Sequence, residues 1–229
     1  MVSMISHSNP IDAQQTLASL ATRYHGAARV FQRHGLDFCC RGQVTLEQAC
    51  RDRRLDVGAL VAELGHVLRT AADDERWDER PVPELIDHLL RHYHDAHRQV
   101  LPHLQAMAAK VERVHAAHED CPRGLAALLQ EITDELESHM QKEEQVLFPM
   151  LRGGHGRYAT APIQVMESEH VEFGEDLARL RALAHDYVPP AGACTTWRAL
   201  CLGLEEFERD AMRHIHLENH VLFPRCRVR

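Results

Sequence analysis

The sequence predicts an all-α protein in which a small helical N-terminal domain is followed by an antiparallel four-helix bundle. Apolar residues recur at helical spacing over long stretches, while strict alternation and runs of β-branched residues are rare. Short segments dense in proline and glycine separate these stretches, and long helices with short links favour an antiparallel bundle. With 229 residues, 45% of them hydrophobic, the chain can bury a substantial core.

Residues 1–71 are expected to form the small domain. Its helices are predicted over 13–34, 45–53 and 56–70. Thr45 and Gln48 have the spacing of a capping box that starts the middle helix. Between the first two helices lies a glycine-flanked turn with adjacent cysteines, Cys39 and Cys40, which we expect to be exposed. The charged, proline-containing segment 72–82 is expected to be a linker.

Residues 83–229 are expected to form the bundle. Its four helices are predicted over 83–118, 124–152, 161–186 and 194–226. Each break between them holds residues that end helices or turn the chain: Asp120 to Gly124, Gly153 to Gly156, and Pro189 to Gly192. The short breaks predict that consecutive helices are antiparallel neighbours.

The composition excludes several classes of protein. A net charge of -8, with no compensating basic stripe, argues against nucleic acid as a partner. No apolar run is long enough to span a membrane, and the first residues do not resemble a signal peptide, so we expect no membrane partner and a cytoplasmic location. Seven cysteines at irregular spacings do not predict a disulfide framework.

One pattern occurs twice in the bundle, 75 positions apart (214 minus 139). His139 precedes Glu143, and His214 precedes Glu218, by four residues; in each copy Leu-Phe-Pro begins four residues after the glutamate. On a helix, residues four apart lie on one face, about 6 Å apart along the axis. The two copies therefore predict one shared site of nitrogen and oxygen ligands. We interpret the Leu-Phe-Pro tails as core packing and helix termination.

The other two bundle helices each supply a matching histidine, His94 and His170. These lie 76 positions apart, close to the 75 of the repeat, so the bundle resembles a duplicated helical hairpin. His94 is chosen over neighbours such as His97 on this offset. His115 is excluded, because it lies 21 positions beyond His94, or about 31 Å along a continuous helix.

A cluster of carboxylates and imidazoles inside an apolar bundle is costly unless a cation compensates for it. Four histidines and two bridging glutamates suit two metal ions about 3.5 to 4 Å apart. Imidazole with carboxylate favours iron over manganese or zinc, so we predict two iron ions, joined by an oxide or hydroxide and open to a small ligand. Glu135, Glu169 and Asp210 are expected to accept imidazole N–H groups or to line an access path.

The adjacent thiols of Cys39 and Cys40 form the second candidate site. Neighbouring cysteines bond poorly to each other, but they can bind a metal, exchange thiols or react with nitrogen oxides. The other five cysteines are interpreted as small core or surface residues.

With these residues in view, the chain resembles the iron-sulfur cluster repair di-iron proteins, the RIC family. DFCCRG resembles the signature of the ScdA-type N-terminal domain. YHDAHR, KVERVHA, SHMQKEEQVLFPM, VMESEH, ACTTW and HIHLENHVLFPR resemble the hemerythrin-like domain, so the resemblance covers nearly the whole chain. It places the iron ligands on the six residues that spacing selected: His94, His139, Glu143, His170, His214 and Glu218.

The resemblance implies a cytoplasmic stress-response protein that repairs iron-sulfur clusters damaged by nitric oxide or peroxide. Damaged iron-sulfur proteins would be its clients, a homodimer is compatible with it, and Cys39 and Cys40 would receive iron or exchange thiols. Two alternatives stay open: a NorA-like protein that binds NO, and a di-iron NO reductase. Only the last is an enzyme, so no catalytic residue is assigned, and NO or dioxygen would be the small ligand.

Overall fold

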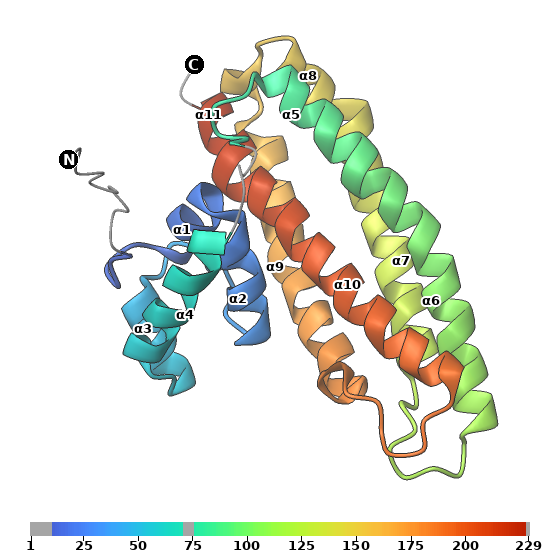
Figure 1. Cartoon of the computed structure of the whole chain (residues 1–229). Helices are drawn as coiled ribbons and strands as arrows, with labels where there is room; N and C mark the ends of the chain where they lie inside the picture. The colour runs from blue at the N-terminus through green and yellow to red at the C-terminus, as the bar shows by residue number, and fades with distance from the viewer. Residues whose placement is uncertain (1–10, 71–75, 228–229) are drawn as a thin grey trace. The chain divides into compact units, whose positions relative to one another are not determined.

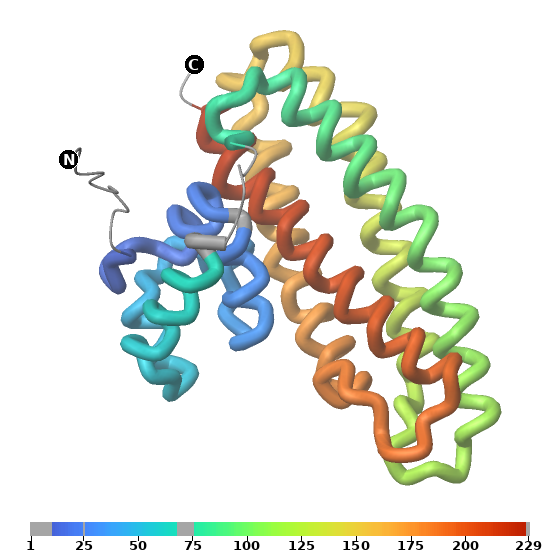
Figure 2. Tube along the Cα trace, viewed as in Figure 1, coloured from blue at the N-terminus to red at the C-terminus, as the bar shows by residue number. Residues whose placement is uncertain are grey.

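The computed structural model describes residues 11–70 and 76–227 (Figures 1 and 2). Within these ranges the only β pairing is an isolated bridge between Thr16 and Thr45, so the all-α prediction is confirmed. The chain divides into two compact units, Met1–Arg76 and Trp77–Arg229. None of the helices in the described ranges has the length and hydrophobicity that a membrane crossing requires.

The described residues of the first unit form four short helices. They are α1 (Leu17–Arg23), α2 (His25–Arg33), α3 (Leu46–Arg53) and α4 (Val57–Thr70). The prediction of one helix over 13–34 is wrong, because the backbone of Tyr24 is extended (φ -138°, ψ 102°) and separates α1 from α2. This break lets the chain pack α1 and α2 against each other.

Threonine caps start two of these helices. Oγ1 of Thr45 accepts the Gln48 N–H at 3.2 Å, and Thr16 caps α1 in the same way through Ser19. The side chain of Gln48 donates to Asp52 at 2.6 Å. Of the predicted capping box, the bond accepted by the threonine side chain is therefore present, while the Gln48 side chain bonds to Asp52 instead. The bridge between the two threonines joins the starts of both helices.

The cysteine turn is more buried than the sequence predicted. Cys39 is only 2% exposed and Cys40 is half-buried. The neighbouring side chains of Leu36 and Phe38 are both buried in the core of this unit, and they draw the turn inward. Oδ1 of Asp37 accepts the backbone N–H of Cys40 at 2.8 Å and of Cys39 at 3.2 Å, which fixes the turn.

The second unit is a bundle of four long helical rods. In chain order its elements are α5 (Val82–Leu89), η1 (Leu90–His94), α6 (Asp95–Val114), α7 (Leu125–Lys142), η2 (Glu143–Leu147), α8 (Phe148–Arg152), η3 (Gly156–Tyr158), α9 (Thr160–Leu183), η4 (His185–Tyr187), α10 (Thr195–Leu217), η5 (Glu218–Leu222) and α11 (Phe223–Arg227). Contacts join α6 to α7, α7 to α9, α9 to α10, and α10 back to α6. The rods alternate in direction (Figure 1).

Three of the four rods contain a π-helical turn in which the backbone is wider than an α-helix: η1, η2 and η5. In each turn a backbone N–H reaches the carbonyl five residues earlier, as Phe148 does to Glu143 and Phe223 does to Glu218. The third rod, α9, is α-helical from Thr160 to Leu183.

The Leu-Phe-Pro tails pack as predicted but do not end their helices. Leu147, Phe148, Leu222 and Phe223 are fully buried in the core at this end of the bundle. Pro149 stands at the start of α8, directly after a π turn, where its missing N–H costs no internal hydrogen bond. The helix therefore continues as α8 to Arg152, and the corresponding rod as α11 to Arg227.

Candidate metal centre

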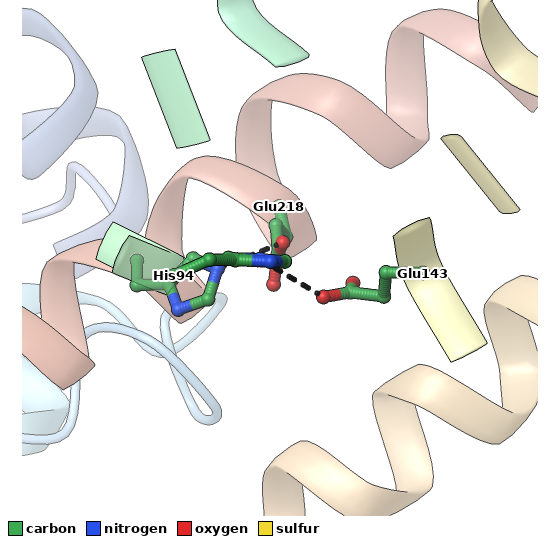
Figure 3. Close-up of side chains that lie close together, drawn as sticks. His94, Glu143 and Glu218 are labelled. Carbon is green, nitrogen blue, oxygen red and sulfur yellow. Dashed lines mark ion pairs between the residues drawn. The ribbon is translucent and has the colours of Figure 1, made fainter. Parts of the chain in front are cut away.

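The structure brings the six residues selected by spacing into one buried cluster. They come from all four rods: His94 ends η1, His139 lies in α7, Glu143 begins η2, His170 lies in α9, His214 lies in α10, and Glu218 begins η5. All six side chains are buried. Three of them, His94, Glu143 and Glu218, are drawn close together in Figure 3.

The cluster consists of two donor groups that share both carboxylates. One group is His94, His214, Glu143 and Glu218, and the other is His139, His170, Glu143 and Glu218. In each group one donor atom per residue lies within 4.8 Å of the others. A pair of ions bridged by two carboxylates requires this sharing.

Imidazole and carboxylate donors face each other at short range. Oε2 of Glu143 lies 3.4 Å from the Nε2 atoms of both His94 and His139. Glu218 lies 3.1 Å from the Nε2 atoms of both His170 and His214. Each glutamate therefore reaches one histidine of each group.

Several of these donors have no hydrogen-bond partner among the described residues. They are both carboxylate oxygens of Glu143, both of Glu218, and Nε2 of His94 and of His214. Fully buried carboxylate oxygens without partners cost several kcal/mol. A cation at the centre of each group satisfies them, so the donor set fits a pair of metal ions.

The two buried carboxylates have opposite electrostatic shifts. Burial and the neighbouring charge of Glu218 raise the pKa of Glu143 well above its usual value. Against the effect of burial, His214 and His170 hold the pKa of Glu218 well below its usual value. Burial and mutual repulsion thus work against two negative charges at this site, and a bound cation would favour both.

The outer nitrogens of three ligand candidates donate to acceptors on neighbouring helices. Nδ1 of His94 donates to Glu144 at 2.8 Å, Nδ1 of His139 to Glu169 at 2.9 Å, and Nδ1 of His170 to Asn219 at 2.8 Å. These bonds direct each Nε2 toward the centre.

Two of these acceptors, Glu144 and Asn219, were missed by the sequence reasoning. Each directly follows a shared carboxylate, Glu143 or Glu218, so they occupy equivalent positions in the repeat. The repeat itself was therefore the signal that could have found them.

Two of the acceptor carboxylates also form an ion pair with a basic side chain. Arg98 donates to Glu144 at 2.8 Å, and Lys142 donates to Glu169 at 2.5 Å. Against the effect of burial, Arg98 and His94 hold the pKa of Glu144 below its usual range. His139 and Lys142 hold the pKa of Glu169 at about 2, again against burial. Both carboxylates therefore stay ionised as acceptors for the imidazole N–H.

A cavity of about 360 Å³ reaches the centre between α7 and α9. Its lining includes three of the ligand candidates, His139, His170 and His214, together with Glu135 and Lys142. Glu135 thus lies in the same cavity as these ligand candidates, and its role stays a prediction.

Asp210, the third residue assigned to these roles, forms an ion pair with Arg209 at 3.3 Å. Its partner is therefore the preceding residue of the same helix. The partners of the ligand imidazoles are Glu144, Glu169 and Asn219, as given above.

Aromatic side chains fix the orientation of the histidines. Tyr93 stacks on His214 with ring centroids 5.2 Å apart and an interplanar angle of 3°. Phe223 stacks on His170 at 6.1 Å and 6°. His97 is buried beside His214 but belongs to neither donor group, and burial, His214 and His94 lower its pKa well below the usual value. It packs as a neutral ring against Phe207.

In the first unit, Asp37, Cys39 and Cys40 form a third group of donor atoms within 4.8 Å of one another. The two sulfur atoms are 3.6 Å apart, and Cys39 Sγ lies 3.3 Å from the Asp37 carboxylate. Contact with Cys40, burial and Asp37 raise the pKa of the Cys39 thiol well above its usual value. Cys39 is therefore a protonated thiol until a cation or an oxidant arrives.

Comparison with known proteins agrees with this arrangement. Residues 85–226 match the family model of the hemerythrin HHE cation binding domain, and residues 13–68 match the ScdA_N domain, a domain of unknown function. The chain is 48% identical over 212 residues to the iron-sulfur cluster repair protein YtfE of Yersinia pseudotuberculosis serotype IB (strain PB1/+), covering 93% of this chain and 96% of the relative. The YtfE protein of Yersinia pestis (strain Pestoides F) gives the same figures.

Proposed function

Since the chain belongs to the hemerythrin HHE family and to the family of iron-sulfur cluster repair proteins, we propose that it repairs damaged iron-sulfur clusters with iron from the buried His/Glu centre. The observation that carries this proposal is the pair of donor groups sharing Glu143 and Glu218. It gives two adjacent positions for iron without any thiolate that would favour zinc.

The donor set also suits release of the metal. Each position offers two imidazole nitrogens and shared carboxylate oxygens, and the cavity between α7 and α9 connects three of the histidines to the surface. Iron, when bound, supplies one-electron chemistry and an open coordination position. Glu135 and Lys142 line the path by which an ion or a small ligand would pass.

We assign the second step of repair to Cys39 and Cys40. Asp37, Cys39 and Cys40 offer one oxygen and two sulfur donors within 4.8 Å, and Cys40 is half-buried and accessible. A thiolate pair holds ferrous iron as a cluster ligand does, so this turn suits transient transfer of iron to a damaged cluster.

A second candidate function is reversible binding of NO, in which the protein lowers or senses free NO. The cavity favours it, because its lining includes His214, whose Nε2 has no hydrogen-bond partner among the described residues. This function requires the centre but not Cys39 or Cys40. Reduction of NO to nitrous oxide would require the same cavity and an electron donor.

One experiment separates these functions. Protein loaded anaerobically with ⁵⁷Fe is incubated with a hydro-lyase whose labile [4Fe–4S] cluster has been destroyed by NO. Recovered hydro-lyase activity and ⁵⁷Fe in its cluster, measured by Mössbauer spectroscopy, are expected with the intact protein. Cys39→Ser/Cys40→Ser is expected to abolish the transfer. Free ⁵⁷Fe²⁺ with an iron chelator is the matched control.

The outcomes differ between the candidates. Recovery without ⁵⁷Fe in the repaired cluster contradicts iron donation. A nitrosyl spectrum that is unchanged in the double cysteine variant, with no recovery of the hydro-lyase, favours NO binding. Nitrous oxide formed when a reductant is supplied favours NO reduction.

A further inference from the structure

A second pair of reactive groups lies at the end of the bundle where α6 ends and α10 begins (Figure 1). His115 is the C-cap of α6, and its N–H donates to the carbonyl of Val111. Cys194 is the N-cap of α10. The two residues are 79 positions apart in the chain, and neither belongs to the metal centre.

The imidazole and the thiol are within hydrogen-bond distance. Nε2 of His115 lies 3.2 Å from Sγ of Cys194. The ring of Trp197, one turn into α10, lies 4.9 Å from the ring of His115 and limits its rotation. The ring of His118 makes an edge contact with the same indole at 5.3 Å. A nucleophile and a base are thus held together by two helix ends.

The two partners stand at opposite kinds of helix end. The C-terminal end of a helix carries a partial negative charge, and His115 stands there on α6. The N-terminal end carries a partial positive charge, and Cys194 stands there on α10. Arg198 adds a positive charge, because its Nε donates to the carbonyl of Ala193 at 3.0 Å, at the same helix end. The thiol and the imidazole thus meet where the N-terminal end of α10 faces the C-terminal end of α6.

Accessibility distinguishes Cys194 from the other three cysteines of the second unit. Cys121, Cys201 and Cys226 are buried, whereas Cys194 is half-buried. Cys201 lies on the same helix, and burial raises the pKa of its thiol. It therefore provides an internal comparison for Cys194.

We propose that Cys194 and His115 form a thiol–disulfide exchange site for low-molecular-weight disulfides. The imidazole Nε2 takes the thiol proton, and the thiolate attacks one sulfur of the disulfide. A new S–S bond joins Cys194 to that half, the original S–S bond breaks, and the other half leaves as a thiolate that takes up a proton. The disulfide is the oxidant, and the product is a mixed disulfide at Cys194.

The test uses the full-length protein and glutathione disulfide as the probe. The rate of modification of each cysteine is followed at pH 7 by quenching with acid and mapping peptides by mass spectrometry. In the wild-type protein Cys194 is expected to react before Cys201. His115→Gln is expected to slow Cys194 about tenfold, because an unassisted thiol is only a few per cent thiolate at this pH. The rate at Cys40, in the other unit, is expected to stay the same.

Two results would overturn the proposal. One is an unchanged rate at Cys194 in His115→Gln, with the fold verified by circular dichroism. The other is a wild-type Cys194 that reacts no faster than Cys201, a comparison that needs no variant and stands even where His115→Gln does not fold.

Discussion

The carboxylate of Glu144 should control metal affinity without touching the metal. It accepts the Nδ1–H of His94 at 2.8 Å and also pairs with Arg98 at 2.8 Å. Glu137 pairs with the same Arg98 at 2.8 Å, lies on the same rod and has a similar exposure. Glu144→Ala and Glu137→Ala thus each remove one ion pair of Arg98, but only Glu144→Ala frees the imidazole.

The magnitudes follow from this difference. Loss of a carboxylate that orients a ligand imidazole typically weakens metal affinity 10- to 100-fold, or about 1.4 to 2.7 kcal/mol. Loss of a half-exposed ion pair costs about 1 kcal/mol or less of stability and lowers the Tm by about 2 to 4 °C. Glu137→Ala should therefore lose only this stability and keep its metal affinity. Glu144→Ala should lose affinity and also somewhat more stability, because the buried Nδ1–H of His94 is left without its acceptor.

Anaerobic titration of the apoprotein with Fe²⁺ against a competing chelator measures the affinity, and thermal denaturation of the apoprotein measures stability. Glu137→Ala is expected to bind Fe²⁺ within twofold of the wild type. The role given to the hydrogen bond between His94 and Glu144 would be refuted if the two variants bound Fe²⁺ with the same affinity, whether that affinity is unchanged or reduced.

Further predictions concern the centre and the scaffold. His214→Ala should keep its fold and lose one of two tightly bound metal equivalents, because the other donor group keeps its residues; metal analysis checks this, and retention of both equivalents would contradict the assignment. Gly156→Ala should lower the free energy of unfolding by about 2 kcal/mol, because a Cβ there would lie 2.3 Å from the carbonyl oxygen of Cys226; chemical denaturation checks this, and an unchanged midpoint would contradict it. Thr45→Ala should cost about 1 kcal/mol in the same assay through loss of the bond to the Gln48 N–H, whereas Thr45→Ser should cost much less.

The sequence predicted most of the centre because the relevant spacing is local. His139 with Glu143, and His214 with Glu218, are four residues apart, and a helix places such pairs on one face whatever surrounds them. The hydrogen bonds to Glu144 and Asn219 cross between helices, so they became evident only once the rods were packed. The pairing of His115 with Cys194 likewise depends on where two helix ends meet.

The sequence did not predict other features, because they depend on packing. Burial of Leu36 and Phe38 draws the cysteine turn inward, although its composition is that of an exposed loop. The proline of each Leu-Phe-Pro tail is ordinarily a sign that a helix ends. Here it follows a π turn, and the sequence contains no local signal for that turn.

The π turns let the rods hold one extra residue without changing the direction of the side chains that follow. Each one holds one more residue in its hydrogen-bonded ring than an α turn does, and in η2 and η5 that turn lies between the shared glutamate and the buried Leu-Phe pair. A five-residue π turn rotates the chain by about as much as four α-helical residues do, so the residues after it keep the faces that they would have in an α-helix one residue shorter. The shared glutamate therefore stays at the centre while the phenylalanine five residues later stays in the core. Because both copies carry the extra residue at the same place, an insertion that is usually a local irregularity has here become part of the repeat, and deletion of one residue there, such as Gln145, is expected to leave an α turn that keeps both features.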